Sequence, residues 1–255
     1  MLFDTHAHYD DERFDEDRDE LLSSMPEKGV ELIVNAGSDL ASSKKSVELA
    51  EKYPFIYAAV GFHPHEAKDM TAEAEAEILT LAKHEKVVAI GEIGLDYHYD
   101  LSPREVQREV FARQIAMAKQ AGLPFVVHER EACKDCLDIL KAEGVGERAG
   151  VMHCFSGSRE TAKIMLDMGM YLSVGGPVTF KNNVKTVDMV AYAPIERLFI
   201  ETDSPYLTPV PHRGKRNDSS YVRFVAEKIA EIKGMDVEEV VEITKNNAKQ
   251  FFKIQ

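Results

Sequence analysis

The sequence carries a set of imidazole and carboxylate side chains that each come at, or just after, the downstream end of a short apolar run. These residues are His6, His8, His63, His65, Glu92, His128, His153 and Asp203. Imidazole and carboxylate groups bind divalent ions such as zinc, manganese and magnesium, and imidazole also exchanges protons near neutral pH. Because parallel α/β barrels keep their chemistry at the downstream ends of strands, the pattern predicts one polar, metal-loaded pocket.

His6 and His8 are the most local part of this pattern. They lie two residues apart at the end of a strand-like run, so the period of a strand places them on the same face. Singly, His128 or His153 fits a core histidine bonded to backbone as well as it fits a metal ligand. Glu92 is harder to explain without a cation, because a carboxylate at the end of a buried strand is costly on its own.

The elements that must position these side chains alternate regularly. We predict strands at residues 2–6, 31–36, 55–61, 87–92, 124–128, 150–153, 170–174 and 198–203. Helical patterns lie between them at residues 18–28, 42–52, 71–84, 104–121, 131–142, 159–168 and 182–192. Strand-like runs with little polar alternation are typical of strands buried on both faces, and helices between strands imply right-handed crossovers. The sequence therefore predicts a closed (β/α)8, TIM-type barrel.

Two further helical patterns, at residues 219–233 and 237–250, follow the last strand and are expected to pack on the outside or bottom of the barrel. We expect residues 1–255 to form a single domain, because their number is typical of one barrel and no linker divides the chain. The alternative is an open, doubly wound sheet. Such a sheet would need a glycine-rich phosphate loop after the first strand, where His6-Ala7-His8-Tyr9 stands instead.

Composition excludes several other classes of protein. Hydrophobic residues make up 44% of the chain and charged residues 29%, which argues against disorder. The chain opens without the segments of a secretory signal, and no apolar run approaches the roughly 18 residues of a membrane span. The lone CxxC of Cys133 and Cys136 indicates ordinary helix cysteines rather than a redox or zinc site. We expect a cytoplasmic protein with no membrane association and no obligatory protein partner.

The formal net charge of −13 opposes non-specific binding to polyanions, so any phosphate recognition must be local. Arg130 is the cation nearest to the candidate ligands in the sequence. Arg213, Lys215 and Arg216 either form a basic lip or lie in an ordinary exposed loop, and both interpretations stay open at this point. The number of candidate ligands exceeds what one catalytic ion needs if it keeps a position for water, which favours two ions.

Several motifs together resemble the TatD-type metal-dependent hydrolases, a branch of the amidohydrolase superfamily. The matching stretches are Phe3-Asp4-Thr5-His6-Ala7-His8, Gly61-Phe62-His63-Pro64-His65, Gly91-Glu92-Ile93-Gly94-Leu95-Asp96-Tyr97, His128-Glu129-Arg130, His153-Cys154-Phe155-Ser156-Gly157 and Glu201-Thr202-Asp203-Ser204-Pro205-Tyr206-Leu207. The combination is specific to that family, although no single motif is. One departure, Asp218-Ser219-Ser220 in place of the more usual Glu-Pro-x, bears on where the following helix starts.

The resemblance implies a (β/α)8 fold, a divalent metal centre and hydrolysis of phosphodiester bonds in DNA. Members often act as 3′ to 5′ exonucleases that prefer single strands, and the sequence does not separate DNA from RNA. The metal ligands that the resemblance implies are His6, His8, Glu92, His128, His153 and Asp203, with Glu92 between the two ions. His63 and His65 match the family's HPH segment, whose task would be to hold a phosphate or polarise the leaving group.

On that ligand set we expect two divalent ions, Mg, Mn or Zn, to activate a water for attack on phosphorus. Asp203 would accept the proton of this water, and Glu92 would be the second catalytic carboxylate. His63 or His65, with Arg130, would stabilise the charge on the phosphoryl oxygens of a nucleic-acid substrate. An amide, lactone or aminoacyl ester is the alternative substrate, because the same centre attacks a carbonyl carbon. A non-catalytic metal-binding protein is the remaining alternative.

Overall fold

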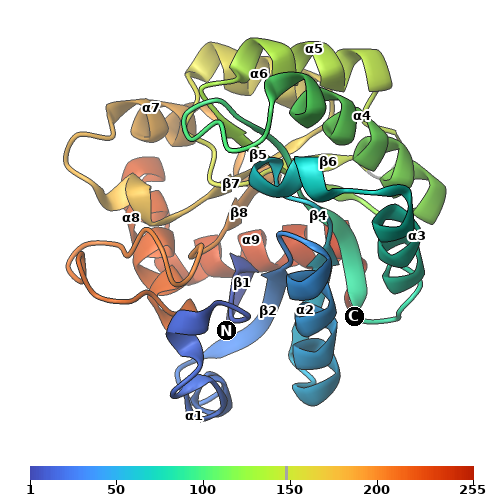
Figure 1. The fold of residues 1–255 in the computed structure, drawn as a ribbon. Helices are drawn as coiled ribbons and strands as arrows, with labels where there is room; N and C mark the ends of the chain where they lie inside the picture. The colour runs from blue at the N-terminus through green and yellow to red at the C-terminus, as the bar shows by residue number, and fades with distance from the viewer. Residues whose placement is uncertain (147–148) are drawn as a thin grey trace. The chain divides into compact units, whose positions relative to one another are not determined.

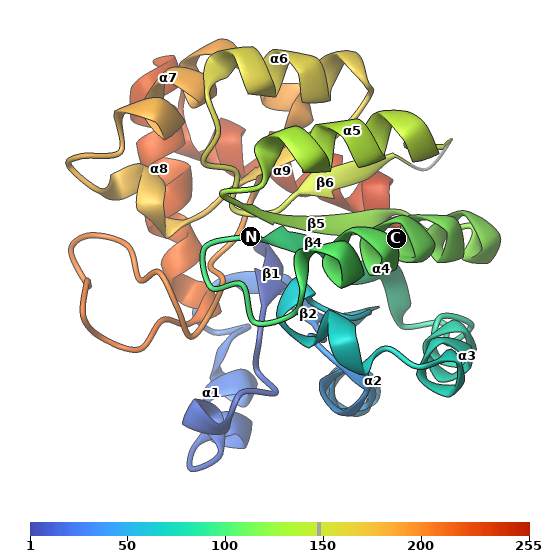
Figure 2. The same cartoon turned by 45° about the horizontal axis from the view of Figure 1, so that its top comes forward.

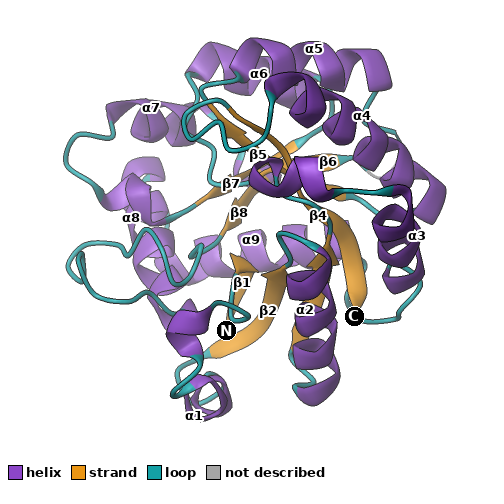
Figure 3. Ribbon diagram, viewed as in Figure 1, coloured by secondary structure: helices purple, strands orange, loops and turns teal. Residues whose placement is uncertain are grey.

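The computed structural model describes residues 1–146 and 149–255. The described strands pair in parallel within one sheet, in which each strand neighbours the next along the chain in the order β1 to β8. Helices connect successive strands (Figure 3), so the predicted (β/α)8, TIM-type fold is confirmed. Residue contacts divide the chain into two compact units, and the expectation of a single domain over residues 1–255 stays a prediction.

The first unit comprises Met1–Asn35 and Cys154–Gln255. Its strands are β1 (Leu2–Ala7), β2 (Val30–Ala36, which ends one residue beyond the unit), β7 (Tyr171–Val174) and β8 (Leu198–Ile200). Its α-helices are α1 (Arg18–Ser24), α6 (Arg159–Asp167), α7 (Val184–Tyr192), α8 (Val222–Lys233) and α9 (Val237–Phe252). Short 3-10 helices are η1 (Glu12–Phe14), η3 (Gly176–Thr179), η4 (Ile195–Arg197) and η5 (Ser219–Tyr221).

The second unit is the continuous segment Ala36–His153. Its strands are β3 (Ile56–Val60), β4 (Val87–Asp96), β5 (Phe125–Arg130) and β6 (Gly150–Met152). Its helices are α2 (Leu40–Lys52), α3 (Ala72–Leu81), α4 (Arg104–Ala121), α5 (Cys133–Glu143) and the 3-10 helix η2 (Pro64–Asp69).

The C-terminal helices of the first unit cover its strands, as predicted. Helix α9 packs against β1 and β8, and α8 packs against the same two strands. The contact is largely aromatic: the Phe199 ring lies 5.2 Å from that of Phe251 and 4.9 Å from that of Tyr171, while Phe3 lies 6.1 Å from Phe252. Burial of such large rings stabilises this end of the unit and anchors β1 and β8 beneath the candidate ligands.

In the second unit β4 pairs with β5 in parallel, with Gly94 opposite His128 and Asp96 opposite Arg130. Helix α4 packs on β4 and runs alongside α5 (Figures 1 and 2). The bounds of α4 coincide with the predicted 104–121, because Gly122 takes the left-handed conformation (φ 67°) that ends a helix cleanly. This packing holds α4 against β4, the strand that carries Glu92.

The predicted ends of α1 and β8 in the first unit are wrong. Helix α1 ends at Ser24 rather than at residue 28, because Pro26 lacks the N–H that a continuing helix needs. Strand β8 ends at Ile200 rather than at residue 203, so Asp203 lies in the loop that follows.

Of the helices in the described residues, none is both long and apolar enough to cross a membrane. The predicted cytoplasmic location stays a prediction.

Candidate active site

The first unit gathers two imidazoles and a carboxylate at the downstream ends of β1 and β8. The Nε2 atoms of His6 and His8 lie 3.1 Å apart, which confirms that the two side chains share a face. The Oδ1 atom of Asp203 lies 3.4 Å from the Nε2 atom of His8 and 3.8 Å from that of His6. His6 is buried, whereas His8 and Asp203 keep a small exposed fraction, so the group opens to solvent on one side.

Backbone hydrogen bonds hold Asp203 beside β1. The N–H of Asp203 donates to the carbonyl of His6 (2.9 Å), and the N–H of His8 donates to that of Ser204 (2.7 Å). Asp203 itself has φ 59°, a left-handed conformation that is rare outside glycine and that aspartate tolerates better than bulky residues do. Backbone in such a region persists only where its surroundings hold it, and it is common at functional sites.

A second buried carboxylate, Asp4, ties this loop to the strand. Its Oδ1 accepts from the Thr202 N–H (2.9 Å), and its Oδ2 accepts from the hydroxyls of Thr202 (2.5 Å) and Ser219 (2.6 Å). Burial raises the pKa of the Asp4 carboxyl to about 7, against the opposing effect of these hydrogen bonds. Sequence analysis gave Asp4 no role. The inward bond of Ser219 also explains why α8 starts at Val222, after one 3-10 turn, rather than at the predicted residue 219.

The second unit gathers three imidazoles around Glu92, which is 3% exposed. Its Oε1 atom lies 2.9 Å from Nδ1 of His128. The same oxygen lies 3.7 Å from Nε2 of His63 and 3.7 Å from Nε2 of His153. The structure therefore brings His63 beside Glu92, whereas the sequence analysis placed it only at the substrate phosphate.

Asp96, which was not among the predicted site residues, joins His65 to His128. Its buried Oδ2 lies 3.0 Å from Nε2 of each ring. Its Oδ1 accepts from the backbone N–H groups of His98 (3.0 Å) and Tyr99 (2.8 Å). A carboxylate bonded to the ring of a metal-binding histidine sets its orientation and tautomer. The sequence signal that could have identified Asp96 is its even spacing from Glu92, which places both acids on one face of a strand.

Strand β4 reaches Asp96, instead of ending at Glu92 as predicted, because of Gly94. This glycine has φ 140°, and a Cβ atom there would lie 2.0 Å from the carbonyl oxygen of His128. Only glycine therefore lets β4 continue in contact with β5. The longer strand brings Asp96 to the Nε2 atom of His128, whose Nδ1 atom faces Glu92.

Contacts between His128 and the two neighbouring carboxylates shift the pKa values of His128 and Asp96. Burial lowers the pKa of His128, but hydrogen bonds with Asp96 and Glu92 outweigh it and raise the pKa to about 9. Burial also raises the pKa of Asp96, yet contact with His128 and the N–H of Tyr99 hold it well below its usual range. Because a metal binds only a ring nitrogen that has lost its proton, an ion at His128 would displace this proton.

Both groups fit a divalent metal by the chemistry of their donor atoms. Donor atoms of His6, His8 and Asp203 lie within 4.8 Å of one another, and so do those of His63, Glu92 and His128. Two imidazole nitrogens with one carboxylate is a donor set that zinc, manganese and related ions accept.

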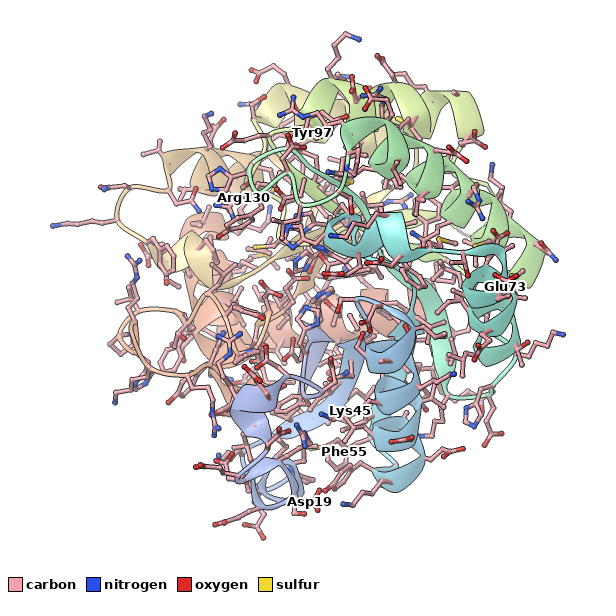
Figure 4. The ribbon with its side chains drawn as sticks, in the orientation of Figure 1. Asp19, Lys45, Phe55, Glu73, Tyr97 and Arg130 are labelled. Atoms are coloured by element: carbon pink, nitrogen blue, oxygen red, sulfur yellow. The ribbon has the colours of Figure 1, made fainter. Side chains whose placement is uncertain are left out.

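Arg130 is the last residue of β5 and is exposed. Its guanidinium carbon lies 4.9 Å from the centre of the Tyr99 ring, and its carbonyl accepts from the N–H of Tyr97 (2.9 Å). Figure 4 labels Arg130 and Tyr97 among the side chains. Within the part of the chain that the structure describes, Arg130 forms no ion pair. Its N–H groups are thus open to an anion.

In the basic loop after β8, Arg213 and Arg216 contact other side chains of the protein. Arg216 donates to both carboxylate oxygens of Asp17 (2.8 and 2.5 Å), and the guanidinium of Arg213 lies 3.9 Å from the centre of the Phe180 ring. These contacts favour the interpretation as an ordinary loop over that of a basic lip.

Asp11 forms an ion pair with Arg13 close to His8. From this pair we predict that the stability of the fold depends on pH. Burial raises the pKa of Asp11, but hydrogen bonds from Arg13 and from the Tyr206 hydroxyl (2.9 Å) outweigh it and lower the pKa to about 2. A depressed carboxyl pKa stabilises the fold above the ordinary value near ~4, and this stabilisation is lost as the pH falls toward 2. Arg13 is 45% exposed, so we expect only about 1 kcal/mol.

Urea unfolding of the wild type and of Asp11→Asn checks this expectation. The variant should be less stable than the wild type at pH 6, and the difference should shrink steadily as the pH is lowered from 4 toward 2. The matched control is Glu16→Gln on the same segment, for which we expect no such change. A difference that is constant over this pH range would contradict the role of the Asp11 charge.

The fold and the two donor groups together define the protein as a metal-dependent hydrolase of the (β/α)8 type. A family model described as "TatD related DNase" matches residues 3–253. The chain belongs to the TatD family, as its motifs predict.

Known relatives agree in length and fold. The "uncharacterized metal-dependent hydrolase YabD" of Bacillus subtilis is 53% identical over 254 residues, covering 100% of both chains. The "3'-5' ssDNA/RNA exonuclease TatD" of Salmonella typhimurium is 30% identical over 259 residues, covering 99% of each. Among solved structures, the TatD homologue YJJV of Escherichia coli superposes with a TM-score of 0.94 at 29% identity, covering 100% of this chain and 98% of that one.

Proposed function

We propose that the protein is a deoxyribonuclease of the TatD type, which removes nucleotides from the 3′ end of single-stranded DNA, and also of RNA, by metal-dependent hydrolysis. The observation that carries the proposal is the pair of histidine–carboxylate donor groups at strand ends of a TatD-family chain. The name of the Salmonella relative, a single-strand exonuclease, supports the choice of substrate.

The proposed metal ligands are His6, His8, Glu92, His128, His153 and Asp203. All but Glu92, which lies within β4, are near or just beyond the downstream ends of strands. Divalent ions, Mg, Mn or Zn, would be held by these residues, and we propose two of them. Bound there, the ions would lower the pKa of a water and offset the charge of a phosphate.

The protein's own side chains divide the remaining work. Asp203 keeps an exposed fraction of 14% and is the proposed acceptor of the proton from water. Glu92 lies among three imidazoles, and its Oε1 atom is within 3.7 Å of a nitrogen of each ring. We propose that this carboxylate keeps the three nitrogens close together. Asp96 orients His65 and His128 through its shared oxygen.

His63, His65 and Arg130 are the proposed contacts to the phosphate. His65 is half-buried and Arg130 is exposed, so both present donors to solvent beside the Glu92 group. Such local positive charge is what a chain of net charge −13 needs in order to bind a polyanion.

A direct test is degradation of a 5′-labelled single-stranded oligonucleotide by the protein supplied with magnesium, manganese or zinc. We expect a ladder of products shortened from the 3′ end, and slower degradation of a blunt duplex of the same sequence. Efficient hydrolysis of an amide, lactone or aminoacyl ester, with no cleavage of DNA or RNA, would contradict the proposal.

Replacement of Asp96 by Asn tests the positioning role of this residue. The amide keeps the shape of the carboxylate but not its charge, so we expect metal affinity to fall about 10- to 100-fold. The measurement is metal content after dialysis at a fixed free metal concentration. Asp100→Asn, at an exposed acid on the following loop, is the control and should bind metal as the wild type does.

A further inference from the structure

Each unit carries an exposed tyrosine next to its histidine–carboxylate group. Tyr99 is 55% exposed and Tyr206 is 43% exposed, although both side chains are large and apolar over most of their surface. Each ring stands edge to face with a histidine of its own group and has an arginine over it. The same arrangement arises from two unrelated segments of the chain.

In the second unit the ring of Tyr99 lies 5.4 Å from that of His65 at an interplanar angle of 86°, and Arg130 lies 4.9 Å from its centre. The backbone N–H of Tyr99 donates to Asp96 (2.8 Å), the carboxylate that also holds His65. The tyrosine is therefore fixed to the same carboxylate as His65 and His128.

In the first unit the ring of Tyr206 lies 6.1 Å from that of His8 at an angle of 76°, and Arg13 lies 4.1 Å from its centre. Its hydroxyl donates to Asp11 (2.9 Å), and its backbone N–H donates to the carbonyl of Asp203 (2.8 Å).

We propose that Tyr99 and Tyr206 are base-stacking residues, each of which holds an unpaired nucleobase of the substrate beside the histidine–carboxylate group of its own unit. The inference rests on the proposed nuclease function and adds the feature that selects single strands. An exposed tyrosine ring beside a cation is how proteins bind single-stranded nucleic acid without sequence preference, because every base has a π-face. Bases in a duplex are already stacked and paired, so they cannot occupy these rings.

The arginines contribute in two ways. The plane of a guanidinium stacks on an aromatic ring, and its N–H edge donates to phosphate oxygens. Arg130 thus places positive charge beside the ring of Tyr99, whereas Arg13 stacks on Tyr206 while its N–H groups donate to the carboxylate of Asp11. Neither contact requires a basic surface elsewhere on this acidic chain.

Removal of the bases from the substrate tests the proposal. Tyr99→Ala and Tyr206→Ala are each expected to lower kcat/KM on a single-stranded oligonucleotide about tenfold, mainly through KM. On the same oligonucleotide with abasic residues at its three 3′-terminal positions, the two variants should match the wild type within about twofold. Tyr99→Phe and Tyr206→Phe keep the ring and should stay close to the wild type. The control is Tyr57→Ala, which removes a tyrosine with Lys86 over its ring (4.3 Å) at the start of β3.

A binding measurement separates this proposal from the nuclease function. Stacking on tyrosine changes the fluorescence of 2-aminopurine, so an oligonucleotide with this base at its 3′ end reports stacking on the metal-supplied, inactive Asp203→Asn protein. We expect the change to shrink when Tyr99→Ala or Tyr206→Ala is added. Fluorescence changes without cleavage by the wild type would overturn the nuclease function and leave the stacking role standing. Equal loss of kcat/KM on intact and abasic substrates, or an unchanged signal in both variants, would overturn the stacking role.

Discussion

Replacement of Asp203 by Asn is expected to lower kcat/KM for hydrolysis about 1000-fold without unfolding the protein, and Glu92→Gln is expected to do the same. Asparagine at position 203 keeps the backbone hydrogen bond to His6 but cannot accept a proton from water. Glutamine at position 92 removes the negative charge of the carboxylate that contacts His63, His128 and His153. The measurement is single-turnover degradation of a labelled oligonucleotide, with circular dichroism to verify the fold.

The two variants should differ in metal content, which separates their roles. Glu92→Gln should lose bound metal, whereas Asp203→Asn should retain more than half of it because His6 and His8 stay in place. Glu131→Gln, a matched substitution of an exposed acid that lies after β5, is the control and should keep wild-type activity. If either site variant degrades substrate as fast as the wild type, the role assigned to that residue is wrong.

Removal of divalent metal is the second change with a large expected effect. Treatment with a chelator should abolish hydrolysis, and addition of magnesium, manganese or zinc should restore it. It should also lower the free energy of unfolding, because a ligand that binds only the folded state stabilises it by about 2.7 kcal/mol at 100 times its Kd. Activity and thermal unfolding, each measured with and without added metal, report the two effects.

The double variant His6→Ala, His8→Ala is the control for the effect on stability. It retains the Glu92 group but removes the paired imidazoles, so added metal should raise its unfolding temperature less than that of the wild type. Full hydrolytic activity in the presence of excess chelator would contradict the proposal that the reaction depends on metal.

Much of the fold could be predicted because it depends on local signals. The helix at residues 104–121 was predicted to the residue, since its amphipathic repeat ends at a glycine suited to the left-handed cap. The pairing of His6 with His8 followed from the period of a strand. Errors came where a local signal was overridden: Pro26 shortened α1, and the loop held by Asp4 took over the last residues predicted for β8.

The candidate site was predictable as a set of residue types but not as a set of contacts. The sequence named the histidines and acids at strand ends, yet it gave no role to Asp96, which holds His65 and His128 from two different segments. It also assigned His63 to the substrate alone, whereas the structure places this ring 3.7 Å from Glu92.

The sequence by itself determined the alternation of strands and helices and the kind of donor atoms, because these depend on residues close together in the chain. It also indicated the family, through a combination of motifs spread along the chain. Only the tertiary structure decided which donors meet. Glu92 and His128 are adjacent because β4 pairs with β5 in one register, and that register exists because Gly94 lets the two strands approach. The same holds for Tyr99 and Arg130, whose contact depends on where β4 and β5 end.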